Sequence, residues 1–214
     1  MNKPLLQLAL DNNTLEDALV SVRELGDVVD ILEVGTILCL TEGMKPVKAI
    51  RALYPNKIIL ADTKCADAGK TVAKNCADAG ANWMTVICCA TIPTMQAALK
   101  EVEELQVELY GDWTFEQAKQ WKEIGIDQVV YHQSRDALLS GQTWGENDFE
   151  KIRKLIDMGF KVSVTGGLDL NSIELFKDLN VHAFIAGRGL RDAQNPRLEA
   201  EKFQDKIKEV FNVE

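Results

Sequence analysis

Short apolar, β-branched runs recur along the chain and alternate with segments of helical periodicity. Between the runs, Thr114-Phe-Glu-Gln matches the capping box that begins many helices. Near-continuous apolar strands are typical of a parallel sheet covered by helices. The predicted strands are Leu5–Leu10, Asp30–Val34, Lys57–Leu60, Trp83–Cys88, Gln106–Leu109, Gln128–Tyr131, Lys161–Val164 and His182–Ala186.

Eight strand–helix units in 214 residues favour an α/β fold of the closed (β/α)₈ type, a TIM barrel, over an open doubly wound sheet. The glycine-rich dinucleotide fingerprint does not follow the first strand, which continues instead as Asp11-Asn12-Asn13. We therefore predict a single barrel domain over residues 1–214. Four helical segments are followed by glycine, and we expect left-handed helix ends at Gly26, Gly80, Gly125 and Gly159.

Polar residues mark the carboxyl ends of most predicted strands, where the active sites of barrels lie. A charged group at the end of a buried strand is unfavourable unless it is solvated, paired or bound to a ligand. For Asp11, a role as the N-cap of the first helix is an equally good explanation. The fourth strand ends in Cys88-Cys89, without a charge. The polar exits are Asp11, Glu33, Asp62, Glu108, His132, Thr165 and Arg188.

Two carboxylates, Glu33 and Asp62, end neighbouring strands and are close enough to share a cation. Oxygen ligands of this kind suit Mg²⁺, which seldom needs a cage made by protein alone. The chain has only two histidines, which argues against zinc. Lys64 follows Asp62 in the sequence Asp62-x-Lys64-x-x-Asp67, where the two acids would keep it cationic and direct it at a developing negative charge. A solvated surface lysine is the simpler alternative.

Two further clusters have the composition of catalytic and anion-binding groups. His132, with Arg135 three residues later, is a candidate proton donor or relay. Glycines after the seventh and eighth strands, in Thr165-Gly166-Gly167 and Gly187-Arg188, allow backbone N–H groups to approach an anion. Two tight turns would explain the glycines but not the arginine, so a phosphorylated substrate is the better interpretation.

Composition narrows the class of protein further. The formal net charge of −9, with dispersed Lys and Arg, argues against nucleic-acid binding. The chain has no apolar run of the roughly 20 residues that span a bilayer, and no signal-peptide pattern, so we expect no membrane association. The five cysteines form no Cys-x-x-Cys motif. Reduced thiols and the absence of a leader predict a cytoplasmic protein.

Seven motifs spread along essentially the whole chain resemble the orotidine monophosphate decarboxylase suprafamily. They are LDN, EVGTILC, KIILADTKCADAG, VICCA, YHQSRDA, VTGG and FIAGR. Asp62-x-Lys64-x-x-Asp67 is specific to the suprafamily, and YHQSRD narrows the resemblance to the 3-keto-L-gulonate 6-phosphate decarboxylases. The implied reaction gives L-xylulose 5-phosphate and CO₂ through a cis-enediolate, in L-ascorbate catabolism.

The resemblance also implies a homodimer of barrels that uses Mg²⁺. Glu33 and Asp62 would bind the metal, and Lys64 would stabilise the enediolate. Asp67 would reach across the dimer interface into the partner's site. The residues that would contact the substrate or its phosphate are Asp11, Glu108, Thr165, Gly166, Gly167, Gly187 and Arg188.

The same resemblance assigns proton delivery through water to His132 and Arg135. It also separates the decarboxylases from the related 3-hexulose-6-phosphate synthases, which condense ribulose 5-phosphate with formaldehyde. The synthases carry smaller or apolar residues at positions 135, 165 and 188. A ribulose-phosphate 3-epimerase would need more histidines. A non-catalytic barrel that binds a sugar phosphate is the alternative from another class.

Overall fold

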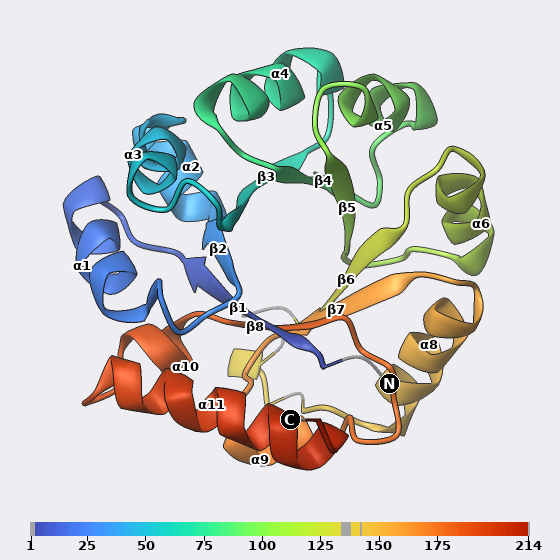
Figure 1. Cartoon of the computed structure of the whole chain (residues 1–214). Helices are drawn as coiled ribbons and strands as arrows, with labels where there is room; N and C mark the ends of the chain where they lie inside the picture. Colours follow the sequence, from blue (N-terminus) through green and yellow to red (C-terminus); the bar gives the residue numbers. More distant parts are fainter. Residues whose placement is uncertain (1–2, 134–137, 142, 214) are drawn as a thin grey trace.

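The computed structural model describes residues 3–133, 138–141 and 143–213, which form a closed barrel of eight parallel strands. The strands pair in chain order, and β1 closes the ring against β8. Figure 1 shows this ring with the helices outside it, which confirms the predicted (β/α)₈ fold. The strands are β1 (Leu5–Leu10), β2 (Ile31–Val34), β3 (Ile58–Cys65), β4 (Trp83–Ile87), β5 (Glu104–Leu109), β6 (Gln128–His132), β7 (Lys161–Thr165) and β8 (Ala183–Ala186).

Helices follow the strands, and the connections after β2 and β8 each contain two of them. The predicted capping box is present: Thr114 Oγ1 accepts a hydrogen bond from the Gln117 backbone, and Gln117 Oε1 accepts one from the Thr114 backbone. The described helices are α1 (Leu15–Leu25), α2 (Thr36–Glu42), α3 (Lys45–Leu53), α4 (Gly69–Ala79), α5 (Ile92–Leu99), α6 (Phe115–Glu123), α8 (Glu146–Asp157), α9 (Leu170–Glu174), α10 (Arg188–Arg191) and α11 (Pro196–Phe211).

Two apolar layers hold the barrel together. The outer layer lies between strands and helices and includes the fully buried Trp121 and Phe184. Burial of a large apolar side chain contributes about 1.5–3 kcal/mol. The inner layer contains Ile31, Leu60 and Trp83, which fill the barrel toward the amino ends of its strands. The other end therefore remains for a site.

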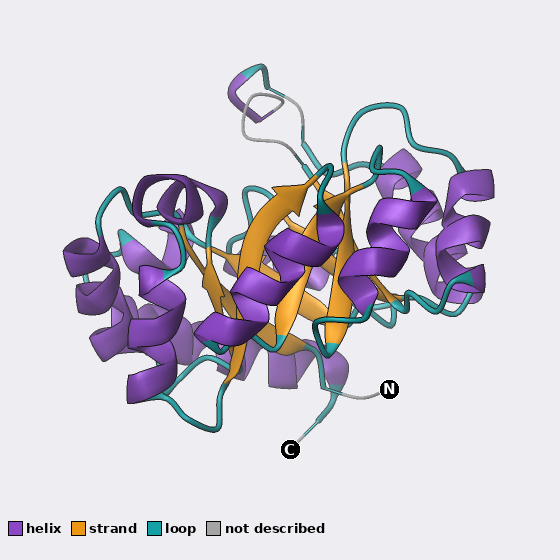
Figure 2. Cartoon of the chain, turned by 90° about the horizontal axis from the view of Figure 1, so that it is seen from above, coloured by secondary structure: helices purple, strands orange, loops and turns teal. Residues whose placement is uncertain are grey.

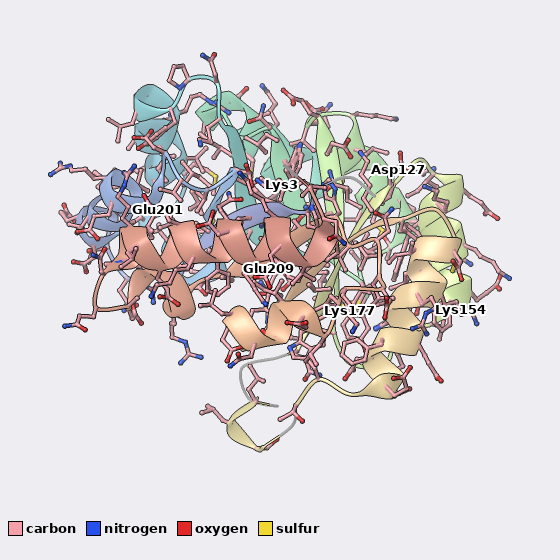
Figure 3. The ribbon with its side chains drawn as sticks, turned by 60° about the horizontal axis from the view of Figure 1, so that its bottom comes forward. Lys3, Asp127, Lys154, Lys177, Glu201 and Glu209 are labelled. Carbon is pink, nitrogen blue, oxygen red and sulfur yellow. The ribbon has the colours of Figure 1, made fainter. Side chains whose placement is uncertain are left out.

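All strand arrowheads in Figure 2 point away from the end where both chain termini lie. The carboxyl ends of the strands thus meet at one end of the barrel. On the outside, Figure 3 shows charged side chains projecting from the helices, among them Lys154 on α8 and Glu201 and Glu209 on α11. Within the described residues, no helix has the length and apolar character needed to cross a membrane.

The third strand is longer than predicted. The sequence suggested an end at Leu60, but β3 continues to Cys65, and its register with β4 shifts between Ala61 and Cys65. Lys64 adopts a left-handed backbone conformation there, with φ of 44°. A polar strand end of this kind does not look like a strand in sequence, because its apolar pattern has already stopped.

One of the four predicted left-handed helix ends is wrong. Gly80, Gly125 and Gly159 have positive φ as expected, but Gly26 has φ of −59°. The reason for glycine at this position is space. A Cβ on Gly26 would lie 2.5 Å from the Tyr54 ring, so the absence of a side chain allows α1 to pack against the chain that follows α3.

Candidate active site

A cavity of about 520 Å³ opens among the carboxyl ends of the strands and the loops that follow them. Eleven of the thirteen predicted site residues line it. The other two are Asp67, which is exposed beyond β3 and does not line the cavity, and Arg135, which lies outside the described residues. The eleven are Asp11, Glu33, Asp62, Lys64, Glu108, His132, Thr165, Gly166, Gly167, Gly187 and Arg188.

The ammonium group of Lys64 lies between two buried carboxylates. Its Nζ atom is 2.5 Å from Asp62 Oδ2 and 2.8 Å from Glu108 Oε2. The Lys64 N–H donates to Thr85 Oγ1 at 2.9 Å, which holds the left-handed backbone in place. Such a conformation is unfavourable by about 1–3 kcal/mol for a residue other than glycine and is frequent at functional sites. The lysine is therefore held within the cavity and is not a solvated surface residue.

Burial works against charge on Lys64, but the neighbouring Asp62 and Glu108 outweigh it and raise its pKa. Burial likewise opposes the charge on Asp62. The Lys64 ammonium, with hydrogen bonds from Thr36 and Thr85 at 2.5 and 2.7 Å, nevertheless lowers the pKa of Asp62. Both members of the pair consequently stay ionised at neutral pH.

Glu33 has the opposite environment. Burial, followed by the negative charge of Asp62, raises its pKa well above the usual value, although Gln7 Nε2 donates to Glu33 Oε2 at 2.5 Å. Gln7 Oε1 is buried and has no hydrogen-bond partner among the described residues. Two neighbouring buried acids and a free amide oxygen form a place that favours a cation.

These oxygen ligands fit Mg²⁺, a hard cation. The described part of the chain contains no group of three His, Cys, Asp or Glu residues arranged to hold a metal ion. A magnesium ion held by Glu33 and Asp62 would therefore keep coordination positions for water or for substrate oxygens.

On the other side of Lys64, Glu108 connects to His132. Glu108 Oε1 lies 2.6 Å from His132 Nδ1. His132 ends β6 and lines the cavity, where a proton donor can reach a bound substrate. The other histidine, His182, precedes β8 at the opposite end of the barrel and lies against Trp83, in agreement with the structural role expected for it.

The predicted phosphate-binding glycines lie after β7 and β8. Gly166 and Gly167 have positive φ, and a Cβ on Gly166 would lie 2.2 Å from the backbone oxygen of Gln133. Arg188 is exposed at the start of α10 and lines the cavity. This wall of the cavity combines open backbone with a cation, as an anion site requires.

Asp11 does not cap the first helix. Thr14 is the N-cap of α1 and accepts from the Asp17 backbone N–H, whereas Asp11 lines the cavity. Gly35 makes room for it, because a Cβ there would lie 2.4 Å from Asp11 Oδ1. The N-cap alternative is therefore wrong.

Sequence reasoning missed several neutral polar residues that line the cavity. Thr85 lies on β4, the strand without a charged exit, and Gln7 lies two inward positions before Asp11 on β1. A polar residue on the inward-facing side of an apolar strand was the signal available for both. Thr36 and Tyr110 lie beyond strand ends and carried no comparable signal.

Comparisons with known proteins agree with this geometry. Residues 4–203 match the family described as orotidine 5′-phosphate decarboxylase / HUMPS. The chain is 52% identical over 215 residues to 3-keto-L-gulonate-6-phosphate decarboxylase UlaD of Escherichia coli, covering 99% of this chain and 100% of the relative.

Solved structures give the same result. A KGPDC from Streptococcus mutans, solved in complex with a sugar phosphate, is 54% identical, with a TM-score of 0.97 over 98% of this chain and 100% of that chain. A 3-keto-L-gulonate-6-phosphate decarboxylase from Vibrio cholerae is 39% identical, with a TM-score of 0.91 over 98% and 99% of the two chains.

The 3-hexulose-6-phosphate synthase from Salmonella typhimurium is more distant. It is 29% identical to this chain, with a TM-score of 0.89 over 96% and 99% of the two chains. The decarboxylases are thus the nearer of these two groups, as the sequence motifs indicated. The chain belongs to the orotidine 5′-phosphate decarboxylase / HUMPS family, and within it to the group of the 3-keto-L-gulonate-6-phosphate decarboxylases.

Proposed function

We propose that the protein decarboxylates 3-keto-L-gulonate 6-phosphate to L-xylulose 5-phosphate and CO₂, in L-ascorbate catabolism. The observation that carries this function is the Lys64 ammonium fixed between buried Asp62 and Glu108 in the wall of the cavity. The relatives at 52–54% identity over nearly the whole chain, named for this activity, support it.

Loss of CO₂ from a β-keto acid leaves an electron pair that needs a stable destination. When the bond between the carboxyl carbon and its neighbour breaks, the pair moves toward the carbonyl oxygen and forms an enediolate. A fixed cation beside that oxygen stabilises the developing charge without reorganising during the reaction. Lys64 is such a cation, because its acidic neighbours keep it protonated.

We assign magnesium binding to Glu33 and Asp62. The raised pKa of Glu33 and the free oxygen of Gln7 support this assignment. Bound there, Mg²⁺ would supply a Lewis acid for substrate oxygens. Glu33 and Asp62 would orient those oxygens toward Lys64.

The remaining steps fall to the opposite walls of the cavity. His132, beside Glu108, would replace the proton that a water molecule gives to the carbanion carbon, with Arg135 assisting. The glycines after β7 and β8, with Arg188, would hold the phosphate. Asp11 and Thr165 would contact the sugar. The S. mutans relative, solved with a sugar phosphate, supports a phosphorylated ligand.

We further propose a cytoplasmic homodimer whose sites lie at the subunit interface. Asp67 is exposed and does not line its own chain's cavity, which leaves its carboxylate available to a partner subunit. All five cysteines are free, as expected in a reducing compartment.

The first prediction tests the activity itself. The wild type should release CO₂ from 3-keto-L-gulonate 6-phosphate, and Lys64→Ala should lower kcat by roughly 10²–10³, the usual effect of removing one electrostatic stabiliser of a transition state. Lys74→Ala, which removes an exposed lysine paired with Asp78, is the matched control. No CO₂ release by the wild type, or wild-type kcat in Lys64→Ala, would contradict the proposal.

The second prediction concerns magnesium and is read from thermal unfolding. Mg²⁺ at 100 times its Kd should stabilise the wild type by about 2.7 kcal/mol. At about 2–4 °C per kcal/mol, this raises Tm by about 5–11 °C. Glu33→Gln should lose the shift, whereas the exposed control Glu16→Gln should keep it. An equal shift in Glu33→Gln would exclude Glu33 as a ligand.

The same variant has a pH dependence in EDTA. Because the folded-state pKa of Glu33 lies above its unfolded value, its contribution to stability is lost as pH rises from the unfolded pKa through the folded pKa. Glu33→Gln should therefore be more stable than the wild type at pH 8. This advantage should disappear below about pH 4, near the unfolded pKa of a glutamate.

The third prediction concerns the phosphate. Arg188→Ala should raise KM for the phosphorylated substrate by roughly 10- to 100-fold, as expected for a charged hydrogen bond of about 1.5–3 kcal/mol. Arg197→Ala, an exposed arginine of α11 paired with Glu201, should leave KM unchanged. An unchanged kcat/KM in Arg188→Ala would place the phosphate elsewhere.

The fourth prediction concerns Asp67. Asp67→Asn and Lys64→Ala should each be nearly inactive alone, because each removes one residue from every site. Random exchange of equal amounts should restore about a quarter of wild-type activity, since half of the dimers are mixed and half of their sites are intact. If mass spectrometry shows mixed dimers that have no activity, Asp67 serves its own chain's site.

A further inference from the structure

Tyr110 is an unassigned residue of the cavity, and it lies directly against His132. It follows β5, two positions after Glu108, and lines the cavity. Its hydroxyl oxygen is 3.0 Å from His132 Nδ1 and 3.3 Å from His132 Nε2. The two ring centroids are 4.8 Å apart, with the planes tilted by 47°. The imidazole therefore has a carboxylate and a phenol as polar partners.

The two partners have different strengths. Glu108 Oε1 is 2.6 Å from His132 Nδ1, closer than the tyrosine hydroxyl, and is a buried carboxylate. A charge-assisted hydrogen bond at this distance favours a proton on Nδ1, donated to Glu108. The Tyr110 hydroxyl then remains for Nε2, the nitrogen whose proton changes during catalysis.

A hydroxyl suits this position because it both donates and accepts. When Nε2 carries a proton, the Tyr110 oxygen accepts from it. When Nε2 has lost the proton, the hydroxyl donates to the free lone pair. Burial, followed by the charge of Glu108, raises the pKa of Tyr110, so the hydroxyl keeps its own proton.

The backbone of Tyr110 is fixed as well. Its N–H donates to Cys88 Sγ at 3.4 Å, and the Cys88 thiol donates to the Tyr110 carbonyl oxygen at 3.2 Å. Cys88 follows β4, the strand without a charged exit. The thiol thus links that strand to the proton-delivery side of the cavity.

We propose that Tyr110 is a positioning residue for His132, holding the imidazole in one orientation before and after it gives up a proton. The inference rests on the proposed function. In the protonation step, an O–H bond of water breaks as a C–H bond forms at the former carboxyl-bearing carbon. The Nε2 proton of His132 replaces the proton lost by the water, and solvent later reprotonates the ring. An imidazole that moved would deliver this proton less selectively to one face of the enediolate.

The test compares Tyr110→Phe with Tyr131→Phe. Both remove a tyrosine hydroxyl, but that of Tyr131 donates to Asp148 and Tyr131 does not line the main cavity. The reaction is run in D₂O, and NMR of the product gives kcat, KM and the ratio of deuterium on the two faces of the new CHD group. Imidazole ¹⁵N spectra report the tautomer, and the two histidines of the chain make His182 an internal reference.

Tyr110→Phe should lower kcat by roughly 3- to 10-fold with KM within 2-fold, the effect of one neutral hydrogen bond. It should change the face ratio and the His132 resonances, whereas Tyr131→Phe should change neither. Wild-type kcat, face ratio and His132 resonances in Tyr110→Phe would overturn the inference. The ¹⁵N spectra need no turnover, so they test the Tyr110–His132 contact even if the wild type releases no CO₂ and the proposed function fails. Tyr110→Gln, whose amide also donates and accepts, should recover kcat relative to Tyr110→Leu if Tyr110→Phe is too unstable to assay.

Discussion

The ion pairs of Lys64 with Asp62 and Glu108 hold the site together. Three acids, Glu33, Asp62 and Glu108, are buried at one end of the barrel. Burying a charge is strongly unfavourable unless an opposite charge accompanies it. Lys64 neutralises part of this negative charge, and Glu33, whose pKa is raised, marks the part that remains. The local charge deficit provides the physical basis for the proposed magnesium ion.

The barrel makes this arrangement possible by bringing residues far apart in sequence to one end. Asp62 and Glu108 come from strands that are not neighbours, and Lys64 reaches both because its backbone turns into the left-handed region. The register shift in β3 and the hydrogen bond to Thr85 accommodate that turn. Strain in one backbone position is thus compensated by the two ion pairs that it allows. Tyr110 and His132 extend the same polar chain from Glu108 to the opposite wall.

Much of this could be predicted from sequence because parallel barrels have a simple rule. Charged residues at the ends of apolar runs must meet at one edge, so the amino-acid pattern alone places Glu33, Asp62 and Glu108 together. Neutral residues such as Gln7 and Thr85 escaped because a polar side chain within a strand has several ordinary explanations. The length of β3 and the packing role of Gly26 depend on tertiary contacts that leave no local pattern. Asp67 was identified by resemblance, and its partner lies beyond a single chain.

The central claim is that the fixed charge of Lys64 stabilises an enediolate. The reverse of the last step tests it directly, without decarboxylation. L-xylulose 5-phosphate should be incubated with the enzyme and Mg²⁺ in D₂O, and the C1 hydrogens followed by ¹H NMR. The account predicts exchange by the wild type, and at least 10²-fold slower exchange by Lys64→Ala, the usual effect of losing one such stabiliser. Exchange by Lys64→Ala at the wild-type rate would contradict it.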